Sequence, residues 1–131
     1  LASILAELIE PPLLLRQEQP LSLTDSEPEP DLAIVAGTID DFRDEHPATA
    51  ELVIEVAVSS EDLDREKTSL YAEASVGEYW LVLVQKKVVE RYSEPTAAGY
   101  ANSSVVDFDS RISCGCLETV EVDLTEFNYV G

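Results

Sequence analysis

The sequence predicts an α/β domain in which helices flank a mixed central sheet. Three apolar runs, at residues 31–36, 51–58 and 78–84, have the composition of buried strands. A helix is predicted between the second and third runs, over residues 61–74. Its apolar positions recur with helical spacing, as Leu63, Leu70, Tyr71 and Ala74. Strands and a helix that alternate in this order are typical of layered α/β folds.

The remaining elements follow from apolar periodicity and from the proline, glycine and polar residues that interrupt it. Before the first run, the pattern predicts a helix over residues 1–10, extended segments within 13–23 and a polar loop over 24–30. An acidic loop is expected over residues 38–50. Beyond the third run we expect a tight turn at Lys86 and Lys87, an antiparallel hairpin extension and a short final helix. Their expected ranges are strands 88–92, 100–108 and 111–121, a loop at 93–98 and a helix at 123–127.

The composition indicates a globular protein. With 131 residues, we expect one domain over residues 1–131, and no apolar run approaches the roughly 20 residues of a membrane span. The chain does not begin with Met, so we expect native N-terminal residues to be missing. Cys114 and Cys116 are too close for a disulfide framework, and reduced thiols favour a cytoplasmic protein.

The net charge of −19 is the strongest global feature. Twenty-seven acidic residues face eight Lys and Arg, which argues against DNA binding through a generally basic surface. Acidity on this scale favours divalent cations and basic partners.

Two charged residues lie where the pattern predicts burial. Glu55 interrupts the apolar run 51–58, and Lys67 falls between Leu63 and Tyr71 on the apolar face of the helix. Such charges are costly unless they are paired or bind a metal. Asp31 begins the neighbouring strand, so Asp31 and Glu55 can converge as ligands for Mg²⁺ or Mn²⁺. Lys67 would stabilise charge on a phosphoryl oxygen beside them.

Each residue also has a simpler interpretation. Asp31 can simply begin a strand, Glu55 can face water at a sheet edge, and Lys67 can extend past Tyr71 to solvent. Taken singly, each simple interpretation is the more common one. The occurrence of all three in one chain favours a site only in combination with the resemblance described next.

Four segments carry a resemblance to a known family: Pro30-Asp31, the stretch 51–56 with Ser59-Ser60, the stretch 64–71, and Val-Gly-Glu-Tyr-Trp at 76–80. Over residues 1–127 the chain resembles the Uma-two family of restriction endonucleases, which belongs to the PD-(D/E)xK nuclease superfamily. The resemblance implies a restriction-endonuclease-like fold with Asp31 and Glu55 as metal ligands. The superfamily's usual lysine position is Ala57 here, and the family supplies its lysine from the next helix, which matches Lys67.

The resemblance further implies a magnesium- or manganese-dependent endonuclease that cleaves DNA as a homodimer. An acid of the first helix, Glu7 or Glu10, would complete the metal site. The alternative is a non-catalytic acidic interaction domain or DNA mimic on a nuclease fold. A nuclease should gather acids in one pocket with basic residues at its rim, whereas a mimic should spread them over a broad face. The expected rim residues are Arg16, Arg65, Lys86 and Lys87.

Overall fold

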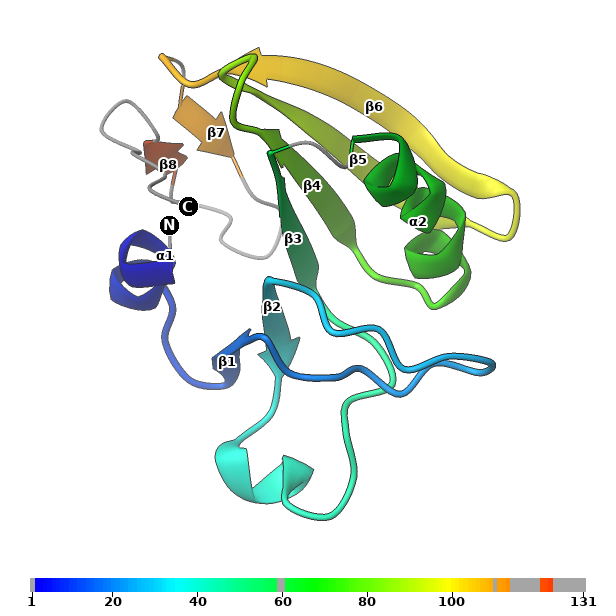
Figure 1. Cartoon of the computed structure of the whole chain (residues 1–131). Coiled ribbons are helices and arrows are strands. Elements are labelled where there is room, and N and C mark those ends of the chain that lie inside the picture. The colour runs from blue at the N-terminus through cyan, green and yellow to red at the C-terminus, as the bar shows by residue number, and fades with distance from the viewer. Residues whose placement is uncertain (1, 59–60, 110, 114–120, 124–131) are drawn as a thin grey trace.

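A computed structural model describes residues 2–58, 61–109, 111–113 and 121–123 of the chain. Within these residues a six-stranded sheet has the order β1-β2-β3-β4-β5-β6, and a short β7-β8 pair stands apart from it (Figure 1). The strands are β1 Leu13–Gln17, β2 Leu32–Ala36, β3 Leu52–Ala57, β4 Glu78–Leu83, β5 Val88–Thr96, β6 Gly99–Asp107, β7 Arg111–Ser113 and β8 Glu121–Asp123. The helices are α1 Ala2–Leu8, α2 Glu61–Glu73 and the 3-10 turn η1 Ile39–Phe42. The predicted mixed sheet with flanking helices and a hairpin extension is confirmed.

The only parallel neighbours in the described sheet are β3 and β4, and α2 makes the connection between them. All other neighbouring strands in it are antiparallel. Because β3 and β4 run in the same direction, their carboxyl ends reach the same edge of the sheet, and α2 begins just beyond that edge. Parallel strands require such a crossover, and the helix therefore covers the sheet next to the end of β3.

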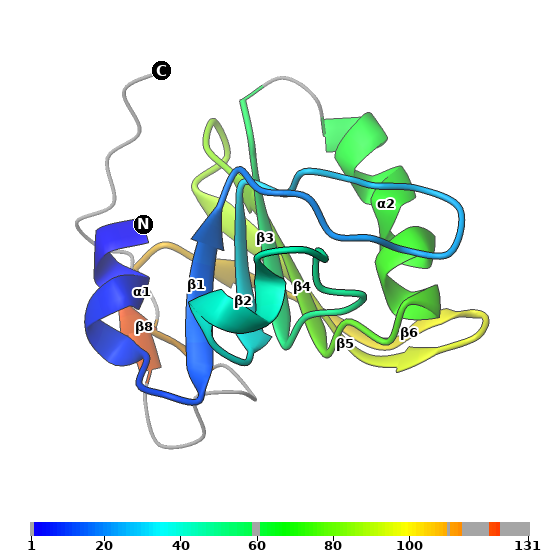
Figure 2. The same ribbon diagram turned by 90° about the horizontal axis from the view of Figure 1, so that it is seen from below.

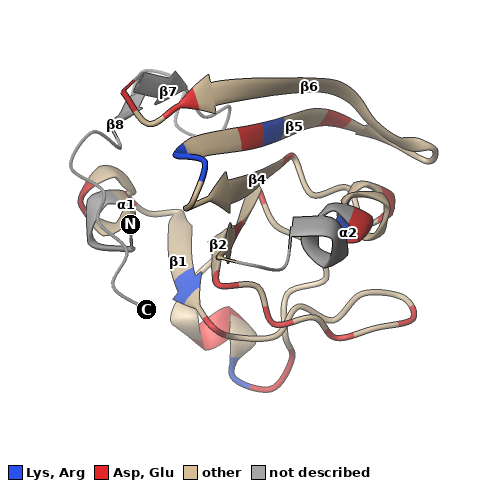
Figure 3. Cartoon of the chain, turned by 45° about the horizontal axis from the view of Figure 1, so that its top comes forward, with Lys and Arg blue, Asp and Glu red and all other residues tan. Residues whose placement is uncertain are grey.

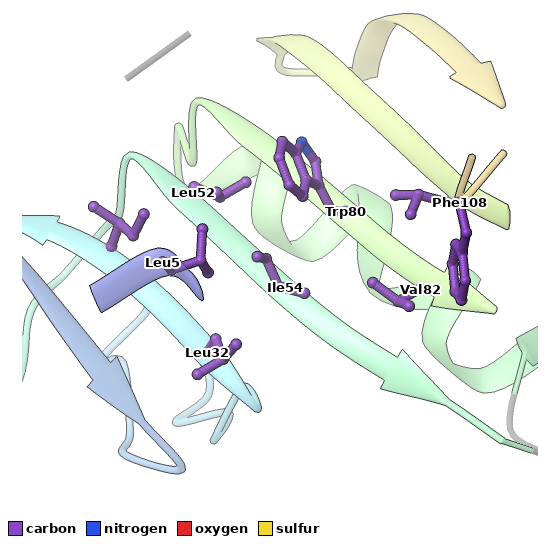
Figure 4. Packing of buried hydrophobic residues seen from close by; sticks show 9 residues of the cluster. Leu5, Leu32, Leu52, Ile54, Trp80, Val82 and Phe108 are labelled. Atoms are coloured by element: carbon purple, nitrogen blue, oxygen red, sulfur yellow. The ribbon is translucent and has the colours of Figure 1, made fainter. Parts of the chain in front are cut away.

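Alternating side chains divide the core into two layers, one on each face of the sheet, and Figure 2 shows α1 and α2 on opposite sides of that sheet. On one face, Leu5 of α1 packs among Leu32, Leu52 and Ile54 (Figure 4). Trp80, Val82 and Phe108 extend this layer. On the opposite face, Tyr71 of α2 packs with Val53, Val76 and Tyr79. The two helices therefore cover opposite faces, and a β3 residue of odd number lies on the α2 side.

The expected loop at residues 93–98 is wrong, because β5 continues to Thr96. The last β4–β5 pair is Glu78 with Ser93, so the continuation pairs only with β6 and lies outside the body of the sheet. A proline at position 95 is tolerated there because no β4 residue needs its amide. The chain reverses at residues 97–98, next to Gly99 with φ +128°.

Other differences are local. The acidic segment 38–50 contains the short turn η1 rather than loop alone. The strand region expected within 111–121 is represented by β7 and β8, which pair antiparallel. Asp123 ends β8, whereas residues 124–127 of the expected final helix lie outside the described residues. The expected N-cap serines, Ser59 and Ser60, and both cysteines also lie outside them. No helix in the described ranges is long and apolar enough to cross a membrane.

Candidate active site

Asp31 and Glu55 lie side by side because of the register between β2 and β3. Leu32 pairs with Ile54 in antiparallel orientation, which places the preceding Asp31 beside the following Glu55. Each carboxylate accepts a hydrogen bond from a main-chain amide of the opposite segment. The Asp31 amide donates to Oε1 of Glu55 at 2.8 Å, and the Val56 amide donates to Oδ2 of Asp31 at 2.7 Å. The two carboxylates are thereby fixed relative to both strands.

Lys67 completes the group from the helix above. Its Nζ donates to Oε2 of Glu55 at 2.5 Å, so the structure brings together all three residues that the sequence singled out. The Glu55 side chain is only 5% exposed, whereas that of Lys67 is 37% exposed. The ammonium therefore stands between a buried carboxylate and solvent, where an incoming anion can reach it.

The position of Lys67 follows from the packing of α2. The ring of Tyr71 lies 5.1 Å from the ring of Tyr79, centroid to centroid, and both are fully buried against Val53. Lys67 precedes Tyr71 by about one helical turn, and Glu55 follows Val53 by two strand positions. The same hydrophobic contact that fixes the helix on the sheet therefore brings Lys67 over Glu55.

The surroundings of Glu55 raise its pKa on balance. Burial raises the pKa of Glu55, because removal from water disfavours the carboxylate. The hydrogen bonds from Lys67 and from the Asp31 amide act in the opposite direction, as does the positive charge of Lys67. The negative charge of Asp31 adds to the increase. A buried carboxylate with a raised pKa beside a second acid is characteristic of functional sites.

The two carboxylates of Asp31 and Glu55 are suitable ligands for a hard divalent cation. Two carboxylates are the usual protein contribution to a Mg²⁺ site, where waters and substrate phosphate supply the other ligands. In the described ranges no cluster of three or more Asp, Glu, His or Cys forms a ready-made metal cage. A cation held by the two carboxylates would have to take its remaining ligands from water and substrate.

The expected third acid from the first helix is not part of this group. Leu5 of α1 belongs to the core layer on the face opposite α2, whereas Glu55 and Lys67 meet on the α2 face. Glu7 and Glu10 therefore lie on the wrong side of the sheet to complete the site. The physical reason is that α1 is held by Leu5 against Leu32 and Ile54, whose side chains alternate away from Asp31 and Glu55.

One acid in the same row was missed by the sequence analysis. Glu55 pairs with Leu81, and Leu81 pairs with Glu90, so Glu90 lies two strands away on the same face. Its Oε1 accepts a hydrogen bond from the Tyr92 hydroxyl at 2.7 Å. The alternation within β5 could have indicated its face, but only the register across three strands places it in this row.

The expected basic rim is present only in part. Arg16 lies over the ring of Phe42 at 5.5 Å and contacts Pro20 and His46, rather than the two acids. Lys86 and Lys87 lie in the turn after β4 (Figure 3). That turn adjoins the end of β3, since the Val84 amide donates to the Ala57 carbonyl at 3.2 Å. These two lysines are therefore at the same sheet edge as Glu55.

The open mixed sheet, with its two acids beneath a helix, has a close counterpart among solved structures. The chain superposes on the crystal structure of a protein from Anabaena variabilis that is described as a putative nuclease, with a TM-score of 0.78. The match covers 95% of this chain and 74% of that chain at 13% sequence identity, so it shows the fold alone.

The family is shown by the sequence itself. Residues 1–125 match the model of the Uma2 (Uma-two) family, whose description is "Putative restriction endonuclease", and the chain belongs to this family. The resemblance expected from its motifs is thereby confirmed. No curated protein matches the chain in sequence.

Proposed function

We propose that the chain is a metal-dependent endonuclease that hydrolyses phosphodiester bonds of DNA. Membership of the restriction endonuclease family and the nuclease fold support the general class. The observation that carries the specific proposal is the meeting of Asp31, Glu55 and Lys67 from three separate segments. We assign Asp31 and Glu55 as ligands of Mg²⁺ or Mn²⁺, and Lys67 as the group that stabilises charge on the phosphate.

The acid pair is preorganised for cation binding. Main-chain amides hold one oxygen of each carboxylate, so neither side chain needs to be ordered when the ion arrives. Asp31 keeps Oδ1 for a ligand, since its hydrogen bond from Val56 uses Oδ2. A bound divalent cation would polarise the phosphoryl oxygen and lower the pKa of the attacking water.

Lys67 acts on the substrate side of the pair. Its ammonium neutralises Glu55 in the absence of other ligands and is exposed enough to donate to a non-bridging phosphate oxygen. The negative charge on those oxygens grows during attack, so a fixed ammonium beside them stabilises the transition state more than the ground state. Ala57, at the superfamily's usual lysine position, has a buried methyl side chain and supplies no charge.

The alternative function is favoured by the distribution of acids. Acidic residues lie on well-separated segments, including the loops at 25–29 and 40–45 and the strand β5, rather than around one pocket (Figure 3). A non-catalytic acidic interaction domain or DNA mimic would have this spread. The two functions differ in one measurable property, because only the nuclease requires the Asp31–Glu55–Lys67 group for its effect on DNA.

The deciding experiment is cleavage of supercoiled plasmid with Mg²⁺ or Mn²⁺. We expect cation-dependent nicking by the wild type, none by Glu55→Gln, and a rate lower by about 10²-fold for Lys67→Ala, the usual effect of removing one charge-stabilising donor. The glutamine retains an oxygen for the Asp31 amide, so the change removes the charge and leaves the shape.

Glu66→Gln is the matched control, because Glu66 is the exposed acid adjacent to Lys67 on the same helix. It should cleave at the wild-type rate. Equal nicking by wild type, Glu55→Gln and Lys67→Ala would exclude this site, and absence of cleavage by the wild type with either cation would favour the mimic.

A further inference from the structure

The outer strand β6 is an open edge of unusual composition. Its side chains from Ala101 to Val105 are all exposed, and Val105 is 64% exposed. In the part of the chain that the structure describes, β6 has β5 as its only strand neighbour. Residues 95–106 contain no charged residue, although the chain as a whole carries −19. A long uncharged edge invites another strand to pair with it.

The opposite edge of the sheet has the usual protection. β1 has five residues against nine in β6, contains the charged Arg16 and is preceded by Pro11 and Pro12. Glu18 follows it with φ 51°, which turns the chain away from the extended direction. Natural sheets block their edges with short strands, charges and prolines. β6 has none of these between Gly99 and Val106.

The backbone of β6 is oriented to accept a partner. The Phe108 amide donates to the Lys87 carbonyl, which identifies the positions whose polar groups face β5. Peptide groups alternate along a strand, so those of Ser103 and Val105 face outward. The central part of β6 therefore offers donors and acceptors to a second strand.

We propose that a second copy of this chain pairs with β6, antiparallel and about a two-fold axis at Ser103. In this register Ser103 faces its own copy, Val105 faces Ala101, and Asp107 faces Gly99. No carboxylate meets another along the strand. Two chains of charge −19 repel each other over most of their surfaces, so an uncharged strand is where they can approach with least electrostatic cost.

The inference deepens the proposed function, because a nuclease that cuts both strands of a duplex needs two sites, and this contact joins two chains into one continuous sheet. It gives the expected homodimer a definite surface. Its test is separate from the test of cleavage, since the association state is measured without DNA or metal.

Sedimentation equilibrium of the full chain across a range of NaCl concentrations tests the contact. We expect the dimer to tighten as salt increases, because screening removes the general repulsion while the strand pairing has no ion pairs to lose. Ser103→Glu and Ser103→Lys should each raise the dimer dissociation constant by about tenfold or more, since each places like charges opposite one another across the axis.

Gln17→Glu and Gln17→Lys, on the exposed end of the other edge strand, are the matched controls and should dimerise like the wild type. Plasmid assays add a functional measurement: Ser103→Glu should still nick one strand but linearise plasmid more slowly than the wild type. A chain that remains monomeric at high salt and high concentration overturns the inference and leaves the edge for a strand of another protein. So does a dimer that withstands both Ser103 variants, or one weakened by Glu but strengthened by Lys.

Discussion

At the level of single residues, Glu55 is a buried acid held by two hydrogen bonds. It accepts from the Asp31 amide and from Lys67, and it is almost completely buried. The hydrogen bonds favour its charged form, but burial and the neighbouring Asp31 outweigh them and raise its pKa. Burial of such a carboxylate costs free energy in its charged form, and a cation bound at the proposed site would offset that cost.

Glu55→Gln should therefore separate cation binding from stability. In EDTA at pH 7, we expect the variant to unfold at the same temperature as the wild type or higher, because it lacks the cost of a buried charge. With Mn²⁺ at a hundredfold excess over its dissociation constant, the wild type should gain about 2.7 kcal/mol and the variant nearly none. Differential scanning calorimetry measures both, with Glu66→Gln as control. A large loss of melting temperature for the variant in EDTA would show a structural role instead.

Tyr100 provides a pH-dependent test away from the site. Its hydroxyl donates to the Val76 carbonyl at 2.7 Å, and burial together with the charge of Glu78 raises its pKa well above the ordinary value. The folded state therefore keeps the phenol proton at a pH where the unfolded chain, with a pKa of about 10, has lost it. The stability from this hydrogen bond is complete below pH ~10 and is lost as the pH rises further.

Tyr100→Phe should accordingly lower the free energy of unfolding by about 1 kcal/mol at pH 7. The difference in free energy of unfolding between wild type and variant should shrink steadily above pH ~10. Ionisation of Tyr100 in the unfolded chain lowers the free energy of unfolding of the wild type, and the variant has no such group. Urea unfolding at pH 7 and at several alkaline pH values measures it. A difference that stays constant to the highest pH at which both proteins fold would contradict this account.

At the level of elements, the connection from α2 to β4 positions the lysine-bearing helix. A Cβ on Gly77 would lie 2.8 Å from the Glu51 carbonyl oxygen, where backbone cannot easily move, since the Glu78 amide also binds that oxygen. Two residues earlier, Ser75 is exposed and has φ 61°, a conformation that glycine adopts without strain. Adding a side chain at Gly77 should therefore lower the stability of the fold, whereas removing the side chain of Ser75 should not.

We expect Gly77→Ala to reduce the free energy of unfolding by about 1–3 kcal/mol, through the clash with the Glu51 carbonyl just before β3. Ser75→Gly should leave it unchanged or raise it by less than about 1 kcal/mol, because relief of strain is partly offset by the greater freedom of the unfolded chain. Guanidinium unfolding of both variants is the measurement. A Gly77→Ala protein as stable as the wild type would contradict the close contact between Gly77 and the Glu51 carbonyl.

The sequence predicted the site better than it predicted the surroundings of the site. Two local periodicities were sufficient to identify Glu55 and Lys67 as charges at positions where burial is expected, since a strand alternates every two residues and a helix every 3.6. The main-chain bonds between Asp31 and Glu55 depend on the β2–β3 register, which no local pattern contains. Likewise, nothing in α1 itself decides which face of the sheet it covers, and the expectation for Glu7 and Glu10 was wrong for that reason.

Local sequence patterns also did not predict the length of β5 or the partner of Arg16. Pro95 argued for a loop, but β5 extends past the end of β4 and tolerates it there. Arg16 was expected near the acids, but Phe42 from a segment far along the chain covers it. Both errors come from tertiary partners that sequence periodicity does not identify.

At the level of the whole molecule, the charge of −19 requires that attraction to DNA be local. Of the basic side chains that the structure describes, Arg16 and Arg43 interact with the η1 region, and Arg91 pairs with Glu78. Lys86 and Lys87 are exposed at the edge of the sheet where β3 ends. We therefore expect DNA to approach the proposed site across this turn.

Changing both Lys86 and Lys87 to Gln should weaken binding of a fluorescent duplex in Ca²⁺ and lower the slope of log K against log salt by up to about 2, since each phosphate that a lysine neutralises adds about one unit to the slope. Arg43→Gln, at an exposed position in the η1 region, is the control and should retain the wild-type slope. Anisotropy titrations between low and moderate salt measure this. Identical slopes for the wild type and the lysine variant would place DNA elsewhere.

The reciprocal attachment of Asp31 and Glu55 to main-chain amides has a consequence for the role of Lys67. Main-chain amides hold one oxygen of each acid without Lys67, so loss of the lysine would remove the proposed charge stabilisation and leave both amide contacts in place. If the proposed site is correct, one substitution at Lys67 would separate the chemistry from the arrangement of the two acids.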